Sequence, residues 1–569
     1  MNAASRSASV GARCARVALA AAAVLAPACA THKPAPAEHP SSEAPTSAEP
    51  SSQASPVAGI GHPEAPAPAT PSAGDFADVP VVRGIDDERV TGPMIVEHYG
   101  TNPTVDTRVQ PVSTFSIDVD TAAYAMTRAA LGSGTLPPRG AVRVEEFVNS
   151  FRYHYPPPLA GVARPEPFSV VAEAFPSPNR RGYHVLVLGL KGRVIDEGVR
   201  PAANLVFVVD VSGSMEGERL QLVKDALALL VERLREDDAV SLVAYGSSAH
   251  VVLPPTSGAD KARIRAALAG LRPEGSTNVQ AGLLLGYEMA KERAGNGRVT
   301  RLILCSDGVA NNGVTDADGI FATIDERAQR GMALTTVGVG MGGYNDVLME
   351  RLASKGQGRY VYVDRPAEAR KAFVENLGGA LVNIASDVKI QLELDVNGVE
   401  RYRLIGFENR HLENHQFADD AVDAGEIGAG HEVTALYEVK LRPGADRIGW
   451  LRVRAKSPGA GESRMIEEEL GARLVRHSMG EASGTSRLAL VASSFAEKLR
   501  GSYWVRNLEW SAIEQQWRAL PAELLRRDDV AELGALITRA RALDTRGDPF
   551  AAEVPLASMD FDHLPVTRR

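Results

Sequence analysis

Apolar runs alternate with amphipathic segments over the middle of the chain. Continuous apolar runs occupy residues 205–209, 239–245 and 299–305, and after each one come segments whose apolar residues recur every three or four positions. The first pattern is typical of strands buried on both faces of a parallel sheet, and the second is typical of amphipathic helices. The alternation over residues 204–364 therefore predicts a mostly parallel, doubly wound α/β domain.

Shorter segments in which apolar and polar positions mostly alternate flank this domain. Two of them lie before it and four after it, at residues 168–173, 183–190, 388–394, 402–406, 432–441 and 450–455. Such alternation indicates antiparallel strands with one covered face. Because each set alone offers too few strands to bury two faces, we expect one β-sandwich in which, or beside which, the α/β domain is inserted.

Helical periodicity marks both ends of the folded region. It appears at residues 122–131 on the N-terminal side and at residues 486–499, 512–520 and 530–543 on the C-terminal side. The predicted division of the chain is a signal peptide (1–28), a Pro/Ala/Ser-rich tether (29–89), an N-terminal flanking domain (90–203), the α/β domain (204–365), a β-sandwich flanking domain (366–480) and a C-terminal helical region (481–569).

The N-terminus carries a targeting pattern. Arginines precede the apolar run 17–25, and small residues follow it up to Cys29. This order is typical of a signal peptide, and the run is too short to span a bilayer. The sequence Ala26-Pro27-Ala28-Cys29 resembles a bacterial lipobox, which implies lipidation of Cys29 and, by the sorting rules for lipoproteins, placement in the outer membrane of the cell envelope. Ala26 stands where a leucine is usual, so ordinary cleavage and secretion are the alternative.

Composition narrows the range of partners. The net charge is -9, the isoelectric point is near 5.8, and acidic and basic residues are mixed throughout. A chain with this charge has no electrostatic footprint for nucleic acid. No glycine-rich phosphate loop with a lysine is found in the sequence, so no nucleotide partner is expected.

Hydroxyl and carboxylate residues stand at the ends of the predicted strands. Asp210, Ser212 and Ser214 follow the first strand, Thr277 lies in a later loop, and Asp307 follows the third strand. The carboxyl ends of parallel strands open into a crevice where ligands bind, so these five oxygen donors converge. Such donors suit a hard divalent cation, whereas the simpler alternative is a turn and a helix cap. As a loop residue, Thr277 is expected to be exposed.

Asp-x-Ser-x-Ser with a later Thr and a later Asp resembles the metal-ion-dependent adhesion site of von Willebrand factor type A (VWA) domains. The resemblance implies that Ser212, Ser214 and Thr277 bind the ion directly and that Asp210 and Asp307 act partly through water. It implies Mg²⁺ as the ion, with Mn²⁺ or Ca²⁺ as alternatives. It also implies a protein ligand that supplies a carboxylate to the metal.

The resemblance extends beyond the metal motif. Residues 112–121, 141–146 and 425–438 are similar to a family of bacterial VWA lipoproteins that has its own N-terminal and C-terminal flanking domains, so the match spans residues 90–545. The flanking domains of that family carry no assigned function. The resemblance thus implies a non-enzymatic cell-envelope lipoprotein, attached to the membrane through its lipid, that binds a protein ligand through a divalent cation.

Two other functions are compatible with the sequence. One is a scaffold or chaperone-like component of an envelope assembly system. The other is a phosphatase, because Asp118 and Asp120 resemble the nucleophile loop of haloacid-dehalogenase phosphatases. The alternative for this loop is structural, with Asp120 or Thr121 capping the following helix.

Overall fold

The computed structural model describes residues 90–551 and Asp562, except for short gaps at 92–93, 119, 160–165, 296, 325–330, 341–343, 376–381, 423 and 458–462. All described residues belong to the second of two compact units, Gly74–Arg569. The predicted signal peptide and tether, including Cys29, lie outside the described residues.

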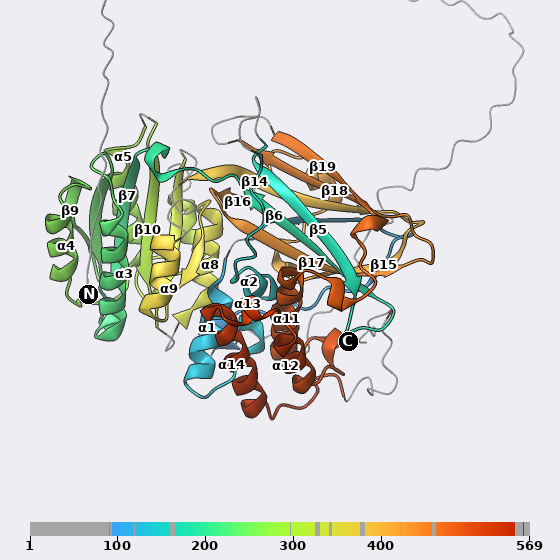
Figure 1. The fold of residues 1–569 in the computed structure, drawn as a ribbon. Coiled ribbons are helices and arrows are strands. Elements are labelled where there is room, and N and C mark those ends of the chain that lie inside the picture. The colour runs from blue at the N-terminus through green and yellow to red at the C-terminus, as the bar shows by residue number, and fades with distance from the viewer. Residues whose placement is uncertain are drawn as a thin grey trace, which may run out of the picture. The chain divides into compact units, whose positions relative to one another are not determined.

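A six-stranded sheet forms the centre of the α/β domain (Figure 1). In spatial order its strands are β13 (Tyr360–Tyr362), β11 (Met332–Gly338), β10 (Val299–Ser306), β7 (Ala203–Asp210), β8 (Ala239–Tyr245) and β9 (Ala249–Ser257). Only β9 runs antiparallel to its neighbour. The predicted doubly wound, mostly parallel sheet is confirmed.

Helices cover both faces of this sheet. They are α3 (Glu218–Glu232), α4 (Lys261–Gly270), α5 (Val279–Lys291), α6 (Ala317–Ala322), α8 (Asp346–Lys355) and α9 (Pro366–Arg370). Leu205 and Phe207 of β7 share a buried cluster with α3, whereas Val206 and Val208 share a second cluster with α5. Burial on both faces explains why this strand is continuously apolar.

Two antiparallel sheets flank the domain. One contains β4 (Val112–Ser116), β14 (Asn383–Leu394), β16 (Gly425–Gly428), β18 (Arg447–Lys456) and β19 (Ser463–Gly471). The other contains β3 (Val105–Asp106), β5 (Phe168–Pro176), β6 (His184–Gly192), β15 (Val399–Ile405) and β17 (Glu432–Leu441). Each sheet combines strands from before and after the α/β domain, so the predicted insertion into an antiparallel sandwich is confirmed.

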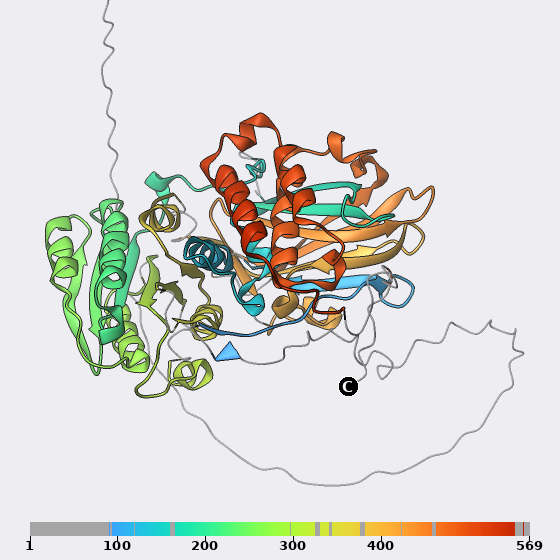
Figure 2. The same cartoon turned by 90° about the horizontal axis from the view of Figure 1, so that it is seen from below.

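The strand β6 shows how the second sheet is covered. Its residues Leu186 and Leu188 lie in one core with Ile390 of the other sheet, which makes the two sheets a sandwich. Val185 and Val187 point to the opposite face, where they pack with α11 (Gly484–Arg500). The C-terminal helices therefore cover the outer face of this sheet, as Figure 2 shows for the red helices. The other C-terminal helices are α12 (Trp510–Arg518), α13 (Ala522–Leu525) and α14 (Asp528–Leu543).

Buried ion pairs join the N-terminal segment to the α/β domain. Arg143, beside the short helix α2 (Val144–Val148), contacts Asp346 of α8 at 2.6 Å, and both side chains are almost fully buried. A two-residue strand, β12 (Tyr344–Asn345), pairs in parallel with β2 (Met94–Val96). The N-terminal segment thus contacts the α/β domain both through strand pairing and through a buried ion pair.

Candidate metal site

Asp210 ends β7 and is fixed from two sides. Its side chain is fully buried. The backbone N–H of Ser212 donates to Oδ1 at 2.8 Å, and the hydroxyl of Ser306 donates to Oδ2 at 2.8 Å. Burial raises the pKa of Asp210 to about 6, and the hydrogen bonds from Ser212 and Ser306 oppose that rise. The carboxylate is therefore ionised at neutral pH and held in one orientation.

The two serines of the motif lie next to each other. Their hydroxyl oxygens are 3.1 Å apart, with Ser212 buried and Ser214 exposed. The N–H of Gly213 donates to the carbonyl of Gly275 at 3.1 Å, so the serine loop is fastened to the loop that carries Thr277. The two loops are far apart in the sequence but adjacent in the structure.

Thr277 is buried, so the expectation that it is exposed is wrong. Only 1% of its surface is accessible. Its N–H donates to Oδ1 of Asn311 at 2.8 Å, and its carbonyl accepts from the N–H of Asn312 at 3.1 Å. Both contacts hold Thr277 against the loop after β10. Its hydroxyl has no hydrogen-bond partner among the described residues. A buried hydroxyl without a partner is costly, and a bound cation would satisfy it.

Asp307 follows β10 and is fully buried. Its Oδ1 accepts from the N–H of Val309 at 3.2 Å, and its Oδ2 accepts from Nη1 of Arg219 at 2.7 Å. The same Nη1 also donates to the carbonyl of Ser214 at 3.0 Å. Arg219 is a residue of the site that the sequence interpretation missed, although its place in the first turn of the helix after the serine loop was a usable signal.

The chemistry of the five predicted residues suits a hard cation. Two carboxylates and three hydroxyls form a set of hard oxygen donors, which Mg²⁺ prefers over nitrogen or sulfur donors. Within the described part of the chain, no group of three or more His, Cys, Asp or Glu side chains is arranged to hold a metal ion. The loop that carries the unpartnered hydroxyl of Thr277 is hydrogen-bonded to the serine loop through Gly275 and Gly213. The residues therefore fit a divalent cation of the Mg²⁺ type.

Asp118 and Asp120 have structural contacts. Oδ2 of Asp118 accepts from Arg410 at 2.9 Å, and Oδ1 of Asp120 accepts from the N–H of Tyr360 at 2.8 Å. Both are almost fully buried. Burial raises the pKa of Asp120, and the charge of Asp118 adds to the rise. Thr121 precedes α1 (Ala122–Gly132) without a side-chain cap, so the capping interpretation is wrong. These contacts within the fold support a structural role for the two carboxylates.

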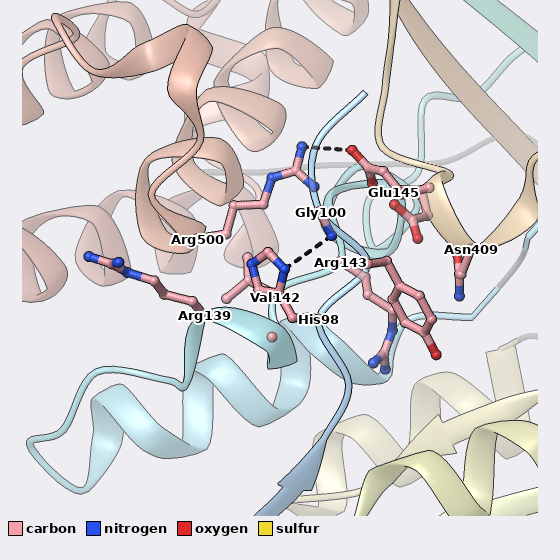
Figure 3. A pocket seen from close by; sticks show the side chains of 11 residues that line it. His98, Gly100, Arg139, Val142, Arg143, Glu145, Asn409 and Arg500 are labelled. Atoms are coloured by element: carbon pink, nitrogen blue, oxygen red, sulfur yellow. Dashed lines mark hydrogen bonds and ion pairs between the residues drawn. The ribbon is translucent and has the colours of Figure 1, made fainter. Parts of the chain in front are cut away.

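A small pocket lies where the N-terminal segment meets α2 and the end of α11 (Figure 3). Arg500 donates to Glu408 at 3.0 Å across it, and the N–H of Gly100 donates to Nδ1 of His98 at 3.0 Å. Burial raises the pKa of Glu145 on its wall to about 7, and Glu408 adds to the rise. None of the five predicted metal-site residues lines this pocket, so it is separate from the candidate metal site.

The wound sheet with its motif at the carboxyl edge defines a VWA domain. A family model described as von Willebrand factor type A domain matches residues 204–376, and one described as von Willebrand factor matches residues 94–187. A third, described as Uncharacterized protein YfbK, C-terminal, matches residues 379–447. VWA domains are protein-interaction or adhesion-type modules and commonly bind a divalent cation.

The chain belongs to the family of the Escherichia coli (strain K12) protein YfbK. It is 36% identical to that protein over 443 residues, which are 74% of this chain and 76% of the relative. It is 28% identical to protein sll0103 of Synechocystis over 295 residues, which are 50% of this chain and 69% of that relative. A solved VWA protein from Catenulispora acidiphila aligns with a TM-score of 0.40 at 15% identity, over 70% of this chain and 99% of its own. The predicted family of bacterial VWA proteins is confirmed.

Proposed function

We propose that this protein is a non-enzymatic, lipid-anchored module of the cell envelope that binds a protein ligand through a divalent cation. The observation that carries the proposal is the buried hydroxyl of Thr277, which has no partner among the described residues and lies in a loop that is hydrogen-bonded to the serine loop after Asp210. A turn or helix cap alone gives no reason to leave that hydroxyl unpaired.

In this proposal Ser212, Ser214 and Thr277 hold the cation directly, and Asp210 and Asp307 orient its waters. The cation supplies a Lewis-acidic position for one carboxylate of the ligand. Two carboxylates offset a divalent charge, so the guanidinium of Arg219 leaves the loaded site net positive. A net positive site favours an anionic ligand group over a neutral one.

The envelope location depends on residues outside the described part. The lipobox-like sequence supports lipidation of Cys29 and outer-membrane placement, with secretion as the alternative. In the described residues, no helix is both long and apolar enough to cross a membrane. Attachment in this proposal therefore depends on the lipid and not on a spanning helix among those residues.

The test begins with the metal itself. Mg²⁺, Mn²⁺ and Ca²⁺ are titrated by calorimetry into the purified chain, and ligands are captured from solubilised envelopes with Mg²⁺ or with chelator. We expect a set of captured proteins that requires the cation and is lost in Asp210→Asn. Asp316→Asn is the matched control, because Asp316 is an exposed helix cap in the same domain. Capture that persists with chelator and with Asp210→Asn contradicts metal-dependent binding and favours the scaffold function.

The anchor is tested separately. Labelling of cells with a fatty-acid analogue is expected to mark the wild type but not Cys29→Ser, because the thiol is the only lipidation point the motif offers. Equal labelling of the two, or a mature N-terminus beyond residue 29, contradicts the anchor and leaves the metal site as the remaining part of the proposal.

A further inference from the structure

Arg301 is a buried cation with neutral partners. It lies in β10 and is only 3% exposed. Its Nη1 donates to the hydroxyl of Thr335 at 3.0 Å, and its Nη2 donates to Oδ1 of Asn383, at the start of β14, at 3.2 Å. Its Nε is buried without a partner. None of these contacts brings a negative charge to the guanidinium.

Arg359 lies immediately before β13, and its carbonyl accepts from the N–H of Thr336 at 2.9 Å, next to the Thr335 that Arg301 contacts. Its Nη1 contacts Nε2 of His431 at 2.9 Å, and its Nε is also buried without a partner. An arginine can only donate, so His431 accepts at Nε2 and its ring is neutral. Among the described residues, neither Arg301 nor Arg359 has a carboxylate within ion-pair distance. Arg143, which is about as buried as Arg301, contacts Asp346 at 2.6 Å.

The surroundings leave positive charge in excess. Burial and the charges of Arg359, Arg301, Lys191 and Arg152 lower the pKa of His431 well below its usual range. Burial, followed by Arg301, lowers the pKa of Arg359 to about 10.

The nearby acidic groups have other contacts. Glu432 pairs with Lys191 at 3.0 Å, and Asp120 lies 3.5 Å from Arg410. Glu426, whose charge favours ionised Arg301, accepts from Nδ2 of Asn383. Buried charges in proteins are normally paired, because an unpaired one is costly. Among the described residues, neither guanidinium group therefore has a paired counter-charge, and Arg301 is buried without one.

We propose that Arg301, Arg359 and His431 form a binding site for a tetrahedral oxyanion of the phosphate class. Guanidinium groups donate paired N–H bonds to such oxygens, and two unpartnered Nε groups are available here. Arg301 forms the buried floor, whereas Arg359 and His431 are partly exposed and leave an approach from their side. The anion joins β10 and β13 of the VWA sheet to β14 and the turn before β17.

Thermal melting of the full chain in phosphate and in chloride at equal ionic strength tests this site. The Tm of the wild type is expected to rise by about 2 °C or more at saturating phosphate, because the anion binds only the folded state. Arg301→Gln and Arg359→Gln each remove one cation and are expected to weaken phosphate binding at least tenfold. Without phosphate, both variants should melt at or above the wild-type temperature, since each removes a positive charge that has no carboxylate partner among the described residues.

The control is Arg452→Gln, which also removes one positive charge but from an arginine paired with Glu393 and Glu467. It should keep the full phosphate response, which excludes a general salt effect. Glycerol phosphate is titrated separately: a response equal to that of inorganic phosphate identifies a phosphomonoester as ligand, and a response to inorganic phosphate alone identifies the free ion. Either result supports the site. A wild-type Tm equal in phosphate and chloride, or variants that respond as the wild type does, overturns it.

Discussion

The two ends of the VWA sheet carry side chains of opposite charge, and these side chains are positioned by different parts of the chain. At the carboxyl end, Asp210 and Asp307 lie in loops that directly follow their own strands, and each accepts hydrogen bonds from the same domain. Towards the amino end, Arg301 and Arg359 meet Asn383 and His431, which come from the flanking sheets. The carboxyl end is therefore a local motif, whereas the amino end exists only when the flanking sheets are in place.

This difference separates the expected roles of the two ends. The carboxyl end has an exposed member, Ser214, and an arginine with a 25% exposed side chain, so a ligand can reach it from solvent. Towards the amino end, Arg301 lies in the seam between domain and flanking sheets. Changes at the carboxyl end should thus alter binding with little effect on folding, and changes towards the amino end should alter how firmly the flanking sheets hold the domain.

The largest expected effect is at Asp210. Asp210→Asn keeps the shape but removes the charge that orients the waters of the cation, so Mg²⁺ affinity should fall about 100-fold, or about 2.7 kcal/mol. Calorimetric titration of Mg²⁺ measures the loss, with Asp316→Asn as control. An unchanged affinity would mean that the carboxyl end is not a cation site.

Thr277 gives a sharper test because its hydroxyl is unpartnered. Thr277→Val keeps the branched shape and loses only that hydroxyl. Mg²⁺ affinity should fall roughly tenfold, since one direct ligand is lost, while the Tm in chelator stays equal or rises slightly because no hydrogen bond is broken. Ser247→Ala, a hydroxyl that contacts Ser276 in the neighbouring loop, is the control. A variant that loses stability in chelator but keeps Mg²⁺ affinity would give Thr277 a purely structural role.

The carboxyl end could be predicted because its signals are local. The apolar strands, the serine loop and Asp307 follow one another in short stretches, and the geometry of parallel sheets brings strand ends together. The burial of Thr277 could not be predicted, because it depends on Asn311, which lies 34 residues further along the chain. A loop residue with polar neighbours carries no pattern that reveals such a contact.

The amino end had no predictive signal. Arg301 is one polar residue within an apolar strand, and its contact with Asn383 is 82 residues away along the chain. Similarly, β4 lies beside β14 although Thr114 and Gln391 are 277 residues apart. Alternation in the sequence identifies that such strands exist and that they share a sandwich, but the register that brings particular polar groups together depends on the packing of the whole unit.

His431 distinguishes the amino end by its pH dependence. The pKa of His431 is lowered in the folded state, so the neutral ring costs no stability above pH 6.5. As the pH falls below 6.5, His431 is protonated in the unfolded chain before it is protonated in the folded protein, and the free energy of unfolding decreases. Between pH 7.5 and 5.5 in phosphate-free buffer, the wild type should lose about 1 kcal/mol more stability than His431→Gln. Thermal melts of the two proteins across this range measure the difference. Parallel curves would show that His431 is not held neutral by its arginine neighbours.

The smallest expected effect concerns Arg219, the cation that contacts Asp307 at the carboxyl end. Its guanidinium occupies Oδ2 of Asp307, so a cation that enters must share or displace it. The side chain is 25% exposed, and solvent screens its charge, so Arg219→Gln should raise Mg²⁺ affinity only about threefold, or about 0.6 kcal/mol. Arg219→Lys keeps the charge and should stay near the wild type. Calorimetry of the three proteins, at low and at high salt, decides the matter, because an electrostatic gain must shrink as salt rises. If Mg²⁺ affinity falls in Arg219→Gln, the arginine supports the cation instead of competing with it, and the carboxyl end then depends on a positive charge as the amino end does.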